Sequence, residues 1–200
     1  MDGKNLLIAP SVALRAETAP AWLEAVLDDF DAFLLDHASA ERKAAAMCTS
    51  FVVQYPDRFA LHIPMIRTAR EELLHYQQVM GLIHKRKLVW ERDEKDPYIQ
   101  ALLAQLSTDR ELRLLDRLIM GGVVEARGVE RFGLVGRHVP DPKLQQFYSR
   151  LSKSEMHHAD LFLHLAGKYF EADRIAARLD RWLDLEAQAM AAVPPRPALH

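Results

Sequence analysis

Four stretches of the chain repeat apolar residues at alternating steps of three and four, and this pattern constrains the fold more than any other feature. Such spacing places one side chain per turn on a single face of an α-helix. The stretches span residues 27–55, 61–82, 115–132 and 144–165. Each predicts a long helix with one buried face, so we expect an all-α protein with a four-helix bundle as its core.

Prolines separate the helices within each pair. Pro56-Asp57 and Pro140-Asp141 each follow the end of a helical pattern, and we expect each aspartate to cap the next helix. Residues 88–108 are too many for a tight turn and predict a crossover with a short helix from Asp96-Pro97 to Leu106. Two hairpins joined by one long crossover are the ferritin-like connection.

The ends of the chain add flanking segments to this bundle. We expect helices around Pro20–Val26 and over Ala172–Ala192, with a frayed end at Pro194–Pro197. The predicted organisation is a single ferritin-like domain over residues 1–200, with the core bundle at about 27–168.

Composition narrows the function classes. Of the 200 residues, 50% are hydrophobic and 27% are charged, which is typical of a soluble globular protein. The single cysteine, Cys48, excludes an internal disulfide and a four-cysteine metal site, and fits a small core residue. Met1-Asp2-Gly3 lacks a basic flank and Pro10 interrupts the apolar start at Leu6, so we expect no secretory signal, no membrane association and a cytoplasmic location.

Six ionisable residues occupy seam positions that an ordinary bundle fills with apolar side chains. A glutamate and a histidine three residues apart lie about 60° apart on one helix face, so both can reach a common point. This pair occurs twice, and each of the other two helices contributes one glutamate. The six are Glu41, Glu72, His75, Glu125, Glu155 and His158.

The register of the hairpins brings these residues to one level. Residues at the same height in an antiparallel hairpin are symmetric about its turn. The midpoint between Glu41 and Glu72 falls between Pro56 and Asp57, and the midpoint between Glu125 and Glu155 is Pro140. Because the prolines were identified independently of the glutamates, this agreement indicates a twofold internal repeat with one shared layer.

The energetics of burial favour a metal site. An unpaired buried carboxylate costs several kcal/mol, and four in one layer also repel one another. Two divalent cations would neutralise four carboxylates, and this oxygen-rich set with two imidazoles suits iron or manganese. For one glutamate a solvated or protonated carboxyl is the better interpretation, but for six residues in one layer we favour a dimetal centre.

Several neighbours of this layer allow two interpretations. His37 lies one turn before Glu41, where it is either an outer partner of a ligand carboxylate or an ordinary core histidine. Glu71 and Glu130 lie off the seams and are expected to face solvent. The glycines around Glu125 either allow close helix packing or leave room for dioxygen or substrate beside the metals; they are Gly121, Gly122 and Gly128.

Four sequence strings resemble the ligand helices of the MiaE family. They are Leu35–Ala45, Arg70–Tyr76, Glu125–Phe132 and Ser154–Asp160, and the resemblance runs from about Leu27 to Leu165. Members of this family hydroxylate 2-methylthio-isopentenyl-adenosine beside the tRNA anticodon. The resemblance implies a non-haem di-iron monooxygenase that uses dioxygen as co-substrate and takes electrons from a separate reductase. It implies that the six seam residues hold two iron ions, with manganese as the alternative metal.

A tRNA substrate also requires cations near the mouth of the site. The candidates are Arg42, Lys43, Lys85, Arg86 and Lys87, together with the third-helix arginines Arg110, Arg113, Arg117, Arg127, Arg131 and Arg137. Residues 84–87 alone are usually a solvated helix end. The net charge of −2 does not favour a nucleic-acid-binding role for the whole surface.

Two further functions stay open from the residues alone. A ferritin-like ferroxidase or iron-storage protein would assemble into a large cage and need no organic substrate. A dimetal oxygenase or peroxidase could act on a small molecule or a lipid chain. The pattern leaves open which carboxylates bridge, the oligomeric state, the identity of the reductase and the stereochemistry of hydroxylation.

Overall fold

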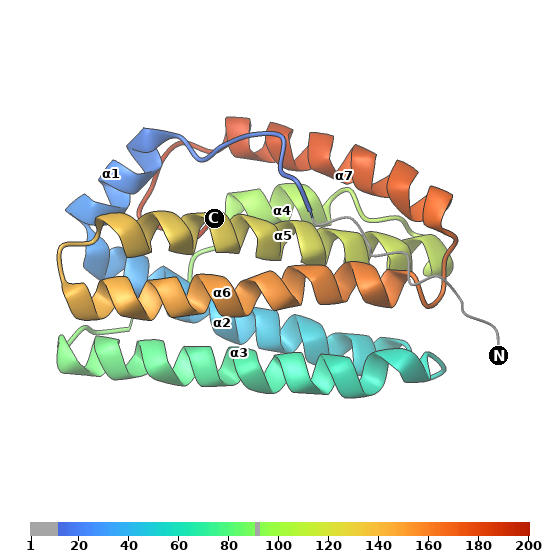
Figure 1. Cartoon of the computed structure of the whole chain (residues 1–200), viewed down its shortest axis with the longest axis horizontal. Coiled ribbons are helices and arrows are strands. Elements are labelled where there is room, and N and C mark those ends of the chain that lie inside the picture. The colour runs from blue at the N-terminus through green and yellow to red at the C-terminus, as the bar shows by residue number, and fades with distance from the viewer. Residues whose placement is uncertain (1–11, 91–92) are drawn as a thin grey trace.

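The computed structural model describes residues 12–90 and 93–200, and in these residues the chain forms seven helices and no strand. Four long helices lie side by side as a bundle (Figure 1): α2 (Phe30–Gln54), α3 (Phe59–Lys85), α5 (Arg110–His138) and α6 (Pro142–Ala166). α2 packs against α3, and α5 packs against α6. The predicted all-α bundle of two hairpins is therefore confirmed.

Three shorter helices complete the structure. α1 (Pro20–Asp28) and α7 (Ala172–Ala192) lie along one side of the bundle, and α4 (Pro97–Leu103) lies within the crossover (Figure 1). The two flanking helices agree with the prediction, whereas α4 ends one turn before the predicted Leu106. None of the helices in the described part of the chain is long and apolar enough to cross a bilayer. The predicted absence of a leader concerns Met1–Pro10, which lie outside the described residues.

The helix starts confirm one of the two expected aspartate caps. The side chain of Asp141 accepts a hydrogen bond from the backbone N–H of Lys143 at the start of α6, and Asp96 caps α4 in the same way. Asp57 does not cap α3, because Arg58 occupies the capping position and Asp57 pairs with Arg110 instead.

The first predicted stripe also begins in the wrong place. Asp29 interrupts the helical pattern by accepting a hydrogen bond from the backbone N–H of Ala32, which caps α2. Leu27 therefore belongs to α1, where its side chain is exposed rather than buried in the seam.

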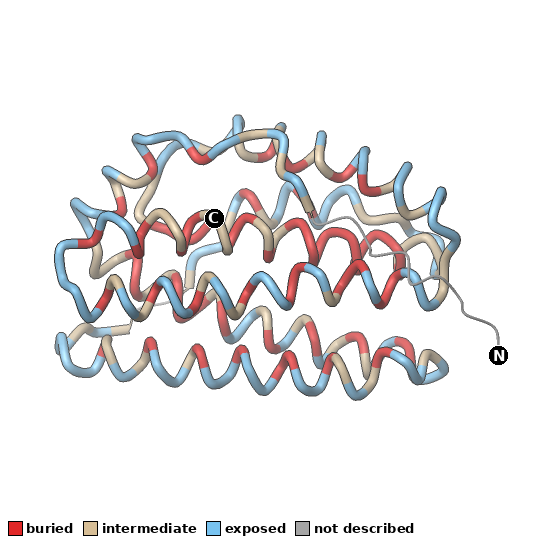
Figure 2. Tube along the Cα trace, viewed as in Figure 1, coloured by how far each residue is buried: buried red, intermediate tan, exposed pale blue. Residues whose placement is uncertain are grey.

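Apolar packing lies on both sides of the central layer. Towards one end of the bundle, Phe51, Leu61, Leu118 and Phe162 belong to one buried cluster. Towards the other end, the helices bury the clusters around Phe33 and Val79. The buried positions line the inner faces of the helices, while the outer face of α3 is exposed (Figure 2). The six ionisable seam residues thus occupy a polar layer between two apolar ones.

Two of the α5 glycines are explained by close helix packing. A Cβ atom at Gly121 would lie 2.8 Å from the Phe162 ring, and one at Gly122 would lie 3.1 Å from the Ala159 carbonyl oxygen. The first distance is shorter than real Cβ contacts, and the second is tighter than most of them. These glycines therefore let α5 approach α6 one turn before Glu125, rather than opening space beside it.

The end of the chain is only partly exposed. Pro194 and Pro195 are exposed, as the prediction of a frayed end at Pro194–Pro197 requires, but the three residues that follow this segment are held against the bundle. Ala198, Leu199 and His200 are all buried. The backbone N–H of Leu199 donates to Asp36 at 2.7 Å, and the indole N–H of Trp22 donates to the carbonyl of Ala198 at 2.8 Å. A proline-rich composition suggested solvent exposure, but these specific hydrogen bonds attach the last residues to α1 and α2.

Candidate dimetal centre

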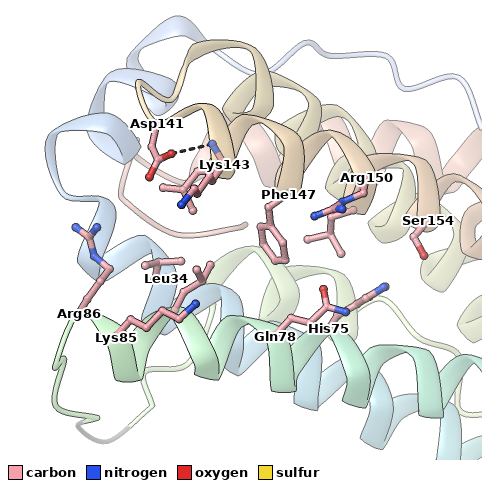
Figure 3. Close-up of a pocket in the computed structure, with 13 residues that line it drawn as sticks. Leu34, His75, Gln78, Lys85, Arg86, Asp141, Lys143, Phe147, Arg150 and Ser154 are labelled. Carbon is pink, nitrogen blue, oxygen red and sulfur yellow. Dashed lines mark hydrogen bonds between the residues drawn. The ribbon is translucent and has the colours of Figure 1, made fainter.

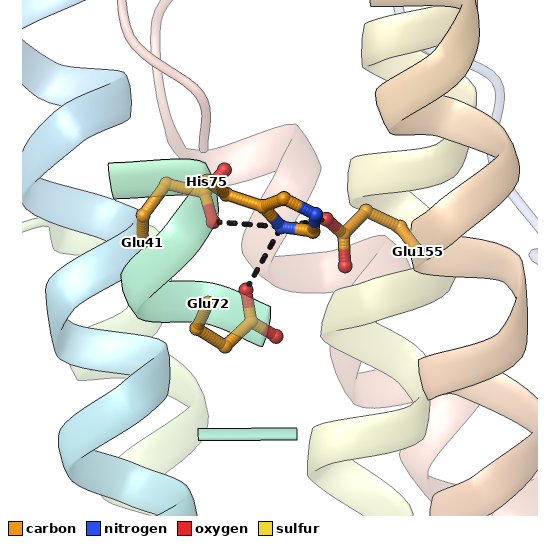
Figure 4. Close-up of side chains that lie close together, drawn as sticks. All are labelled: Glu41, Glu72, His75 and Glu155. Atoms are coloured by element: carbon orange, nitrogen blue, oxygen red, sulfur yellow. Dashed lines mark ion pairs between the residues drawn. The ribbon is translucent and has the colours of Figure 1, made fainter. Parts of the chain in front are cut away.

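The structure brings the six predicted residues together. Glu41 comes from α2, Glu72 and His75 from α3, Glu125 from α5, and Glu155 and His158 from α6. All six side chains are buried, each with 8% exposure or less. Figure 4 shows four of them pointing to one place between the helices.

Each histidine turns its Nδ1 atom towards the carboxylates. Nδ1 of His75 lies 2.9 Å from Oε1 of Glu155, 3.5 Å from Glu72 and 3.6 Å from Glu41. Nδ1 of His158 lies 2.7 Å from Oε2 of Glu155 and 2.9 Å from Oε1 of Glu72. The same ring nitrogen of both imidazoles therefore faces the centre.

The donor atoms fall into two overlapping groups. One contains Glu41, Glu72, His75 and Glu155, and the other contains Glu72, Glu125, Glu155 and His158. Within each group the four donor atoms lie within 4.8 Å of one another. Glu72 and Glu155 belong to both groups, so the geometry provides two adjacent positions with two shared carboxylates.

Unsatisfied polar atoms at this centre show that the residues suit cations. Oε1 of Glu72, Oε1 of Glu155 and Nδ1 of His75 are buried without a well-directed hydrogen bond. Buried polar atoms normally have hydrogen-bond partners, so the lack of partners for these three atoms requires an explanation. Two divalent cations would coordinate these atoms and neutralise four carboxylates, and the donor set fits a dimetal site.

The protonation behaviour of the cluster supports the same conclusion. Burial opposes the charged form of His75, but the close carboxylates of Glu155, Glu41 and Glu72 outweigh it and raise its pKa to about 12. The pKa of His158 is also raised to about 12 against burial, by Glu155 and Glu72. Burial, with repulsion from Glu72 and Glu155, raises the pKa of Glu125 well above its usual value. Without metal, protons must supply the missing positive charge.

His37 contacts the cluster from outside it, as one of its two interpretations predicted. Its Nε2 lies 2.7 Å from Oε1 of Glu41, and its Nδ1 lies 3.2 Å from the Tyr148 hydroxyl. Burial lowers the pKa of His37 to about 3, so the ring is neutral and carries one proton. Since an ionised Glu41 can only accept, Nε2–H donates to it and the hydroxyl of Tyr148 donates to Nδ1. The sequence pattern did not identify Tyr148 as this partner.

The two glutamates expected to face solvent both make specific contacts. The side chain of Glu71 is 56% exposed, but its Oε2 lies 2.8 Å from Nε2 of the buried His158. Glu130 is part-buried and accepts hydrogen bonds from Thr18 and Arg127. The prediction is therefore confirmed for Glu71, which is exposed although the end of its side chain reaches His158, and it was wrong for Glu130. Cys48 is a buried core residue, as expected, and burial raises the pKa of its thiol.

A cavity of about 910 Å³ lies beside the cluster, between the α3 and α6 helices. Of the six cluster residues, His75 alone lines it. Apolar side chains form much of its wall, and side chains of both helices project into it (Figure 3). The apolar lining consists of Leu34, Leu82, Leu144, Phe147 and Leu151, and the basic lining of Lys85, Arg86, Lys143 and Arg150.

Only part of the predicted basic surface lies at this cavity. Lys85 and Arg86 line it, but Arg42, Lys43 and Lys87 do not. Arg42 and Lys43 pair with Asp93 instead. The cavity adds two cations that the sequence analysis did not single out, Lys143 and Arg150, which lie seven residues apart on one face of α6.

Three of the α5 arginines are excluded as phosphate contacts by their burial. Arg117 stacks over the Phe51 ring at 4.1 Å, and Arg127 pairs with Glu130 and Glu186. Arg131 is 4% exposed and donates to the carbonyl of Leu199. These guanidinium groups join α5 to neighbouring segments of the protein, so the expectation that they bind tRNA was wrong.

Comparison with known proteins identifies the family. Residues 6–200 match the family model described as MiaE, tRNA-(MS2IO6A)-hydroxylase. This chain belongs to the MiaE family. The resemblance inferred from the four ligand strings is therefore confirmed.

Two relatives carry the name tRNA 2-(methylsulfanyl)-N(6)-isopentenyladenosine(37) hydroxylase. The relative from Pseudomonas putida is 36% identical over 163 residues, which cover 82% of this chain and 79% of the relative. The relative from Salmonella typhimurium is 33% identical over 123 residues, or 62% of this chain, and the matched part spans less than half of that protein, 45%.

A solved structure shares the fold of this MiaE-family chain. It is described as a protein with aldehyde deformylating oxygenase activity from Synechococcus, and its TM-score to this chain is 0.89. The two are 33% identical, and the match covers 94% of each chain. This similarity confirms the predicted ferritin-like architecture.

Proposed function

We propose that this chain hydroxylates the isopentenyl group of 2-methylthio-isopentenyl-adenosine in tRNA. Its family and the names of both relatives support this reaction. The observation that carries the proposal is a buried carboxylate–histidine cluster that meets, through His75, a cavity with an apolar wall and basic residues. A tRNA substrate would place the enzyme in the cytoplasm.

The proposed metal ligands are the six clustered residues. Glu41 and His75 would serve one ion, Glu125 and His158 the other, and the shared Glu72 and Glu155 would bridge them. Two irons bound there would supply dioxygen activation, in which one oxygen atom enters the substrate C–H bond and the other leaves as water. This balance needs two electrons and two protons from outside. With one buried cysteine the chain offers no iron–sulfur ligand set, so we propose a separate reductase as partner.

The cavity suits the two chemically different parts of this substrate. The prenyl group is apolar and would pack against Leu82, Phe147 and Leu151, with its reacting carbon towards His75. The nucleotides around it carry phosphates, which Lys143 and Arg150 would bind as ion pairs. Bases of an anticodon loop are unpaired and can be turned outward, so a side chain on such a base can enter a cavity of this kind.

The protein's own groups prepare the site for this reaction. His37 holds one oxygen of Glu41 and leaves the other directed towards the centre. The apolar layers on both sides of the cluster exclude water and strengthen the electrostatic interactions within it. Geometry and exclusion of solvent are therefore what the bundle contributes to the chemistry.

The direct test uses iron-loaded protein with prenylated tRNA, a reductant and dioxygen. Mass spectrometry of the digested tRNA is expected to show the prenylated nucleoside gaining one oxygen atom. Matched controls are tRNA without the prenyl group and a Glu72→Ala variant that lacks a bridging carboxylate. Finding no oxygenated nucleoside with fully loaded protein and a competent reductant would refute the proposed function.

The Synechococcus structure supports a second candidate, an oxygenase reaction on an aldehyde. An uncharged molecule would use the apolar wall but would leave Lys143 and Arg150 at the cavity without a role. We therefore favour tRNA, and the same reaction mixture with a fatty aldehyde in place of tRNA distinguishes the two. An iron-storage role would instead require a cage-sized particle, which gel filtration detects.

A further inference from the structure

The outer side of His158 faces a carboxylate that does not belong to the six-residue cluster. Nε2 of His158 lies 2.8 Å from Oε2 of Glu71, while its Nδ1 lies within 2.9 Å of Glu72 and Glu155. His158 is buried, whereas Glu71 lies at the surface. The imidazole is therefore held between the buried carboxylates and one carboxylate at the protein surface.

Two consecutive residues of α3 contact opposite sides of this ring. Adjacent residues on a helix point about 100° apart, so Glu72 faces the interior while Glu71 reaches His158 from the outside. A carboxylate only accepts hydrogen bonds, so with a metal ion at Nδ1 the proton of His158 must sit on Nε2 and donate to Glu71. Glu71 thus selects the tautomer and the ring orientation that direct Nδ1 to the centre.

The other histidine lacks such a partner among the described residues. His75 turns the same nitrogen to the cluster but lines the cavity, and no described carboxylate contacts its Nε2. The internal repeat accounts for this difference. Glu71 directly precedes Glu72 on α3, and the residue in the corresponding place before Glu155 on α6 is Ser154, which is neutral and lines the cavity.

We propose that Glu71 is a positioning residue for His158 and makes the two metal positions unequal. The position formed by Glu72, Glu125, Glu155 and His158 is the tighter one, because Glu71 orients its imidazole and increases the basicity of the ring. The position beside His75 is the weaker one and faces the cavity. This inference rests on the proposed dimetal centre and goes beyond it by ranking the two positions.

The test is a titration of the metal-free full chain with Co²⁺, followed by calorimetry and by the absorption of the bound ion. The wild-type protein is expected to bind two ions with two distinct affinities. Glu71→Ala is expected to weaken the tighter step about 10–100-fold, as loss of a ligand's outer partner does elsewhere. Glu71→Gln keeps an acceptor oxygen without the charge and is expected to lose less.

The variants suit this measurement because Glu71 is exposed in the middle of a helix, where alanine is well tolerated. Glu24→Ala, an exposed glutamate on α1, is the matched control and should bind as the wild type does. A second readout is the Nε2–H proton of His158, which the bound Co²⁺ shifts out of the crowded NMR region. It should exchange slowly in the wild type and rapidly in Glu71→Ala.

The possible outcomes separate this proposal from the one on which it rests. If the wild type binds two ions and Glu71→Ala binds them equally tightly, with an unchanged N–H exchange rate, the role of Glu71 is overturned and the dimetal centre is not. A wild-type chain that binds no Co²⁺, or a single ion, would overturn the dimetal centre and the ranking of its positions together.

Discussion

Glu125 and Glu186 are both buried, but replacing each by glutamine should change the stability of the metal-free protein in opposite directions. Glu125 belongs to the carboxylate cluster, where burial and the charges of Glu72 and Glu155 raise its pKa. Glu186 is also buried, but its carboxylate accepts hydrogen bonds from Arg127 at 2.8 and 3.1 Å. One carboxylate is unfavourable without metal, and the other is neutralised within the protein.

For Glu125→Gln, the metal-free protein is expected to become more stable. A buried charge without a compensating partner costs several kcal/mol, so we expect a neutral side chain of similar volume to stabilise the metal-free protein by about 1–4 kcal/mol. For a chain of this size that gain raises Tm by roughly 2–16 °C. In the presence of metal, Glu125→Gln should instead gain less stability from metal binding than the wild type does. At a metal concentration 1,000-fold above Kd, binding adds about 4.1 kcal/mol, and a 100-fold weaker site reduces this to about 1.4 kcal/mol.

For Glu186→Gln, both metal states are expected to lose stability equally. The substitution leaves the buried guanidinium of Arg127 without one of its two carboxylates, since Glu130 still pairs with it. Breaking a buried ion pair costs about 3–5 kcal/mol. Because Glu130 still pairs with Arg127, we expect a loss at the lower end of this range, about 3 kcal/mol. The rise in Tm on adding metal should therefore match that of the wild type.

Scanning calorimetry of both variants, with and without metal, makes the comparison. The decisive quantity is the Tm of metal-free Glu125→Gln relative to the wild type. A clear decrease would mean that Glu125 is well solvated or well paired in the folded protein, which would refute the argument that metal ions compensate this cluster. Glu186→Gln controls for the general effect of neutralising a buried glutamate.

Three further expectations concern the surroundings of the cluster. His37→Phe should lower metal affinity about 10–100-fold by releasing the α2 carboxylate, and His37→Gln, which keeps an N–H donor, should recover much of it in the same Co²⁺ titration. Replacing Lys143 and Arg150 together by alanine should raise KM for tRNA without changing kcat, and should reduce the slope of log affinity against log salt by about 1 per lost phosphate contact. The histidines of the cluster should make the stability of the metal-free protein depend on pH. Folding raises the pKa of His75 and His158 to about 12. Above the usual histidine pKa of 6.5, the metal-free folded state therefore binds more protons than the unfolded state. Its Tm should therefore fall as pH rises above about 6.5, whereas the Tm of metal-loaded protein, measured in parallel, should not.

The members of the cluster were predictable because each is an ionisable residue at a helix position that is normally apolar. A glutamate on an apolar seam conflicts with burial. One proline marks the turn of each hairpin, Pro56 or Pro140, and so sets which residues lie at the same level, without reference to the glutamates. These constraints are local in sequence, so periodicity alone could identify Glu41, Glu72, Glu125 and Glu155 as neighbours. The structure brings them together at the predicted layer.

The surroundings of the cluster depend on contacts between helices, which periodicity does not specify. Lys143 and Arg150 occupy positions on α6 that could equally face solvent, and only the separation of α3 from α6 turns them towards a cavity. Tyr148 is an ordinary seam residue until its hydroxyl meets His37. The burial of the last three residues was not predictable for a related reason, because Asp36 and Trp22 bind their backbone from distant parts of the chain.

The unequal surroundings of the two histidines follow from one difference between the two helices that carry a Glu-x-x-His pair. Both Glu-x-x-His pairs are preserved, so the internal repeat alone would predict two equivalent metal positions. The residue before each pair is not preserved, since α3 carries Glu71 where α6 carries Ser154. A carboxylate beside His75 would have placed negative charge on the wall of the cavity, where it would repel the phosphates of a tRNA. A neutral residue there keeps the cavity accessible to an anionic substrate, while the carboxylate on the opposite side stabilises the more deeply enclosed position.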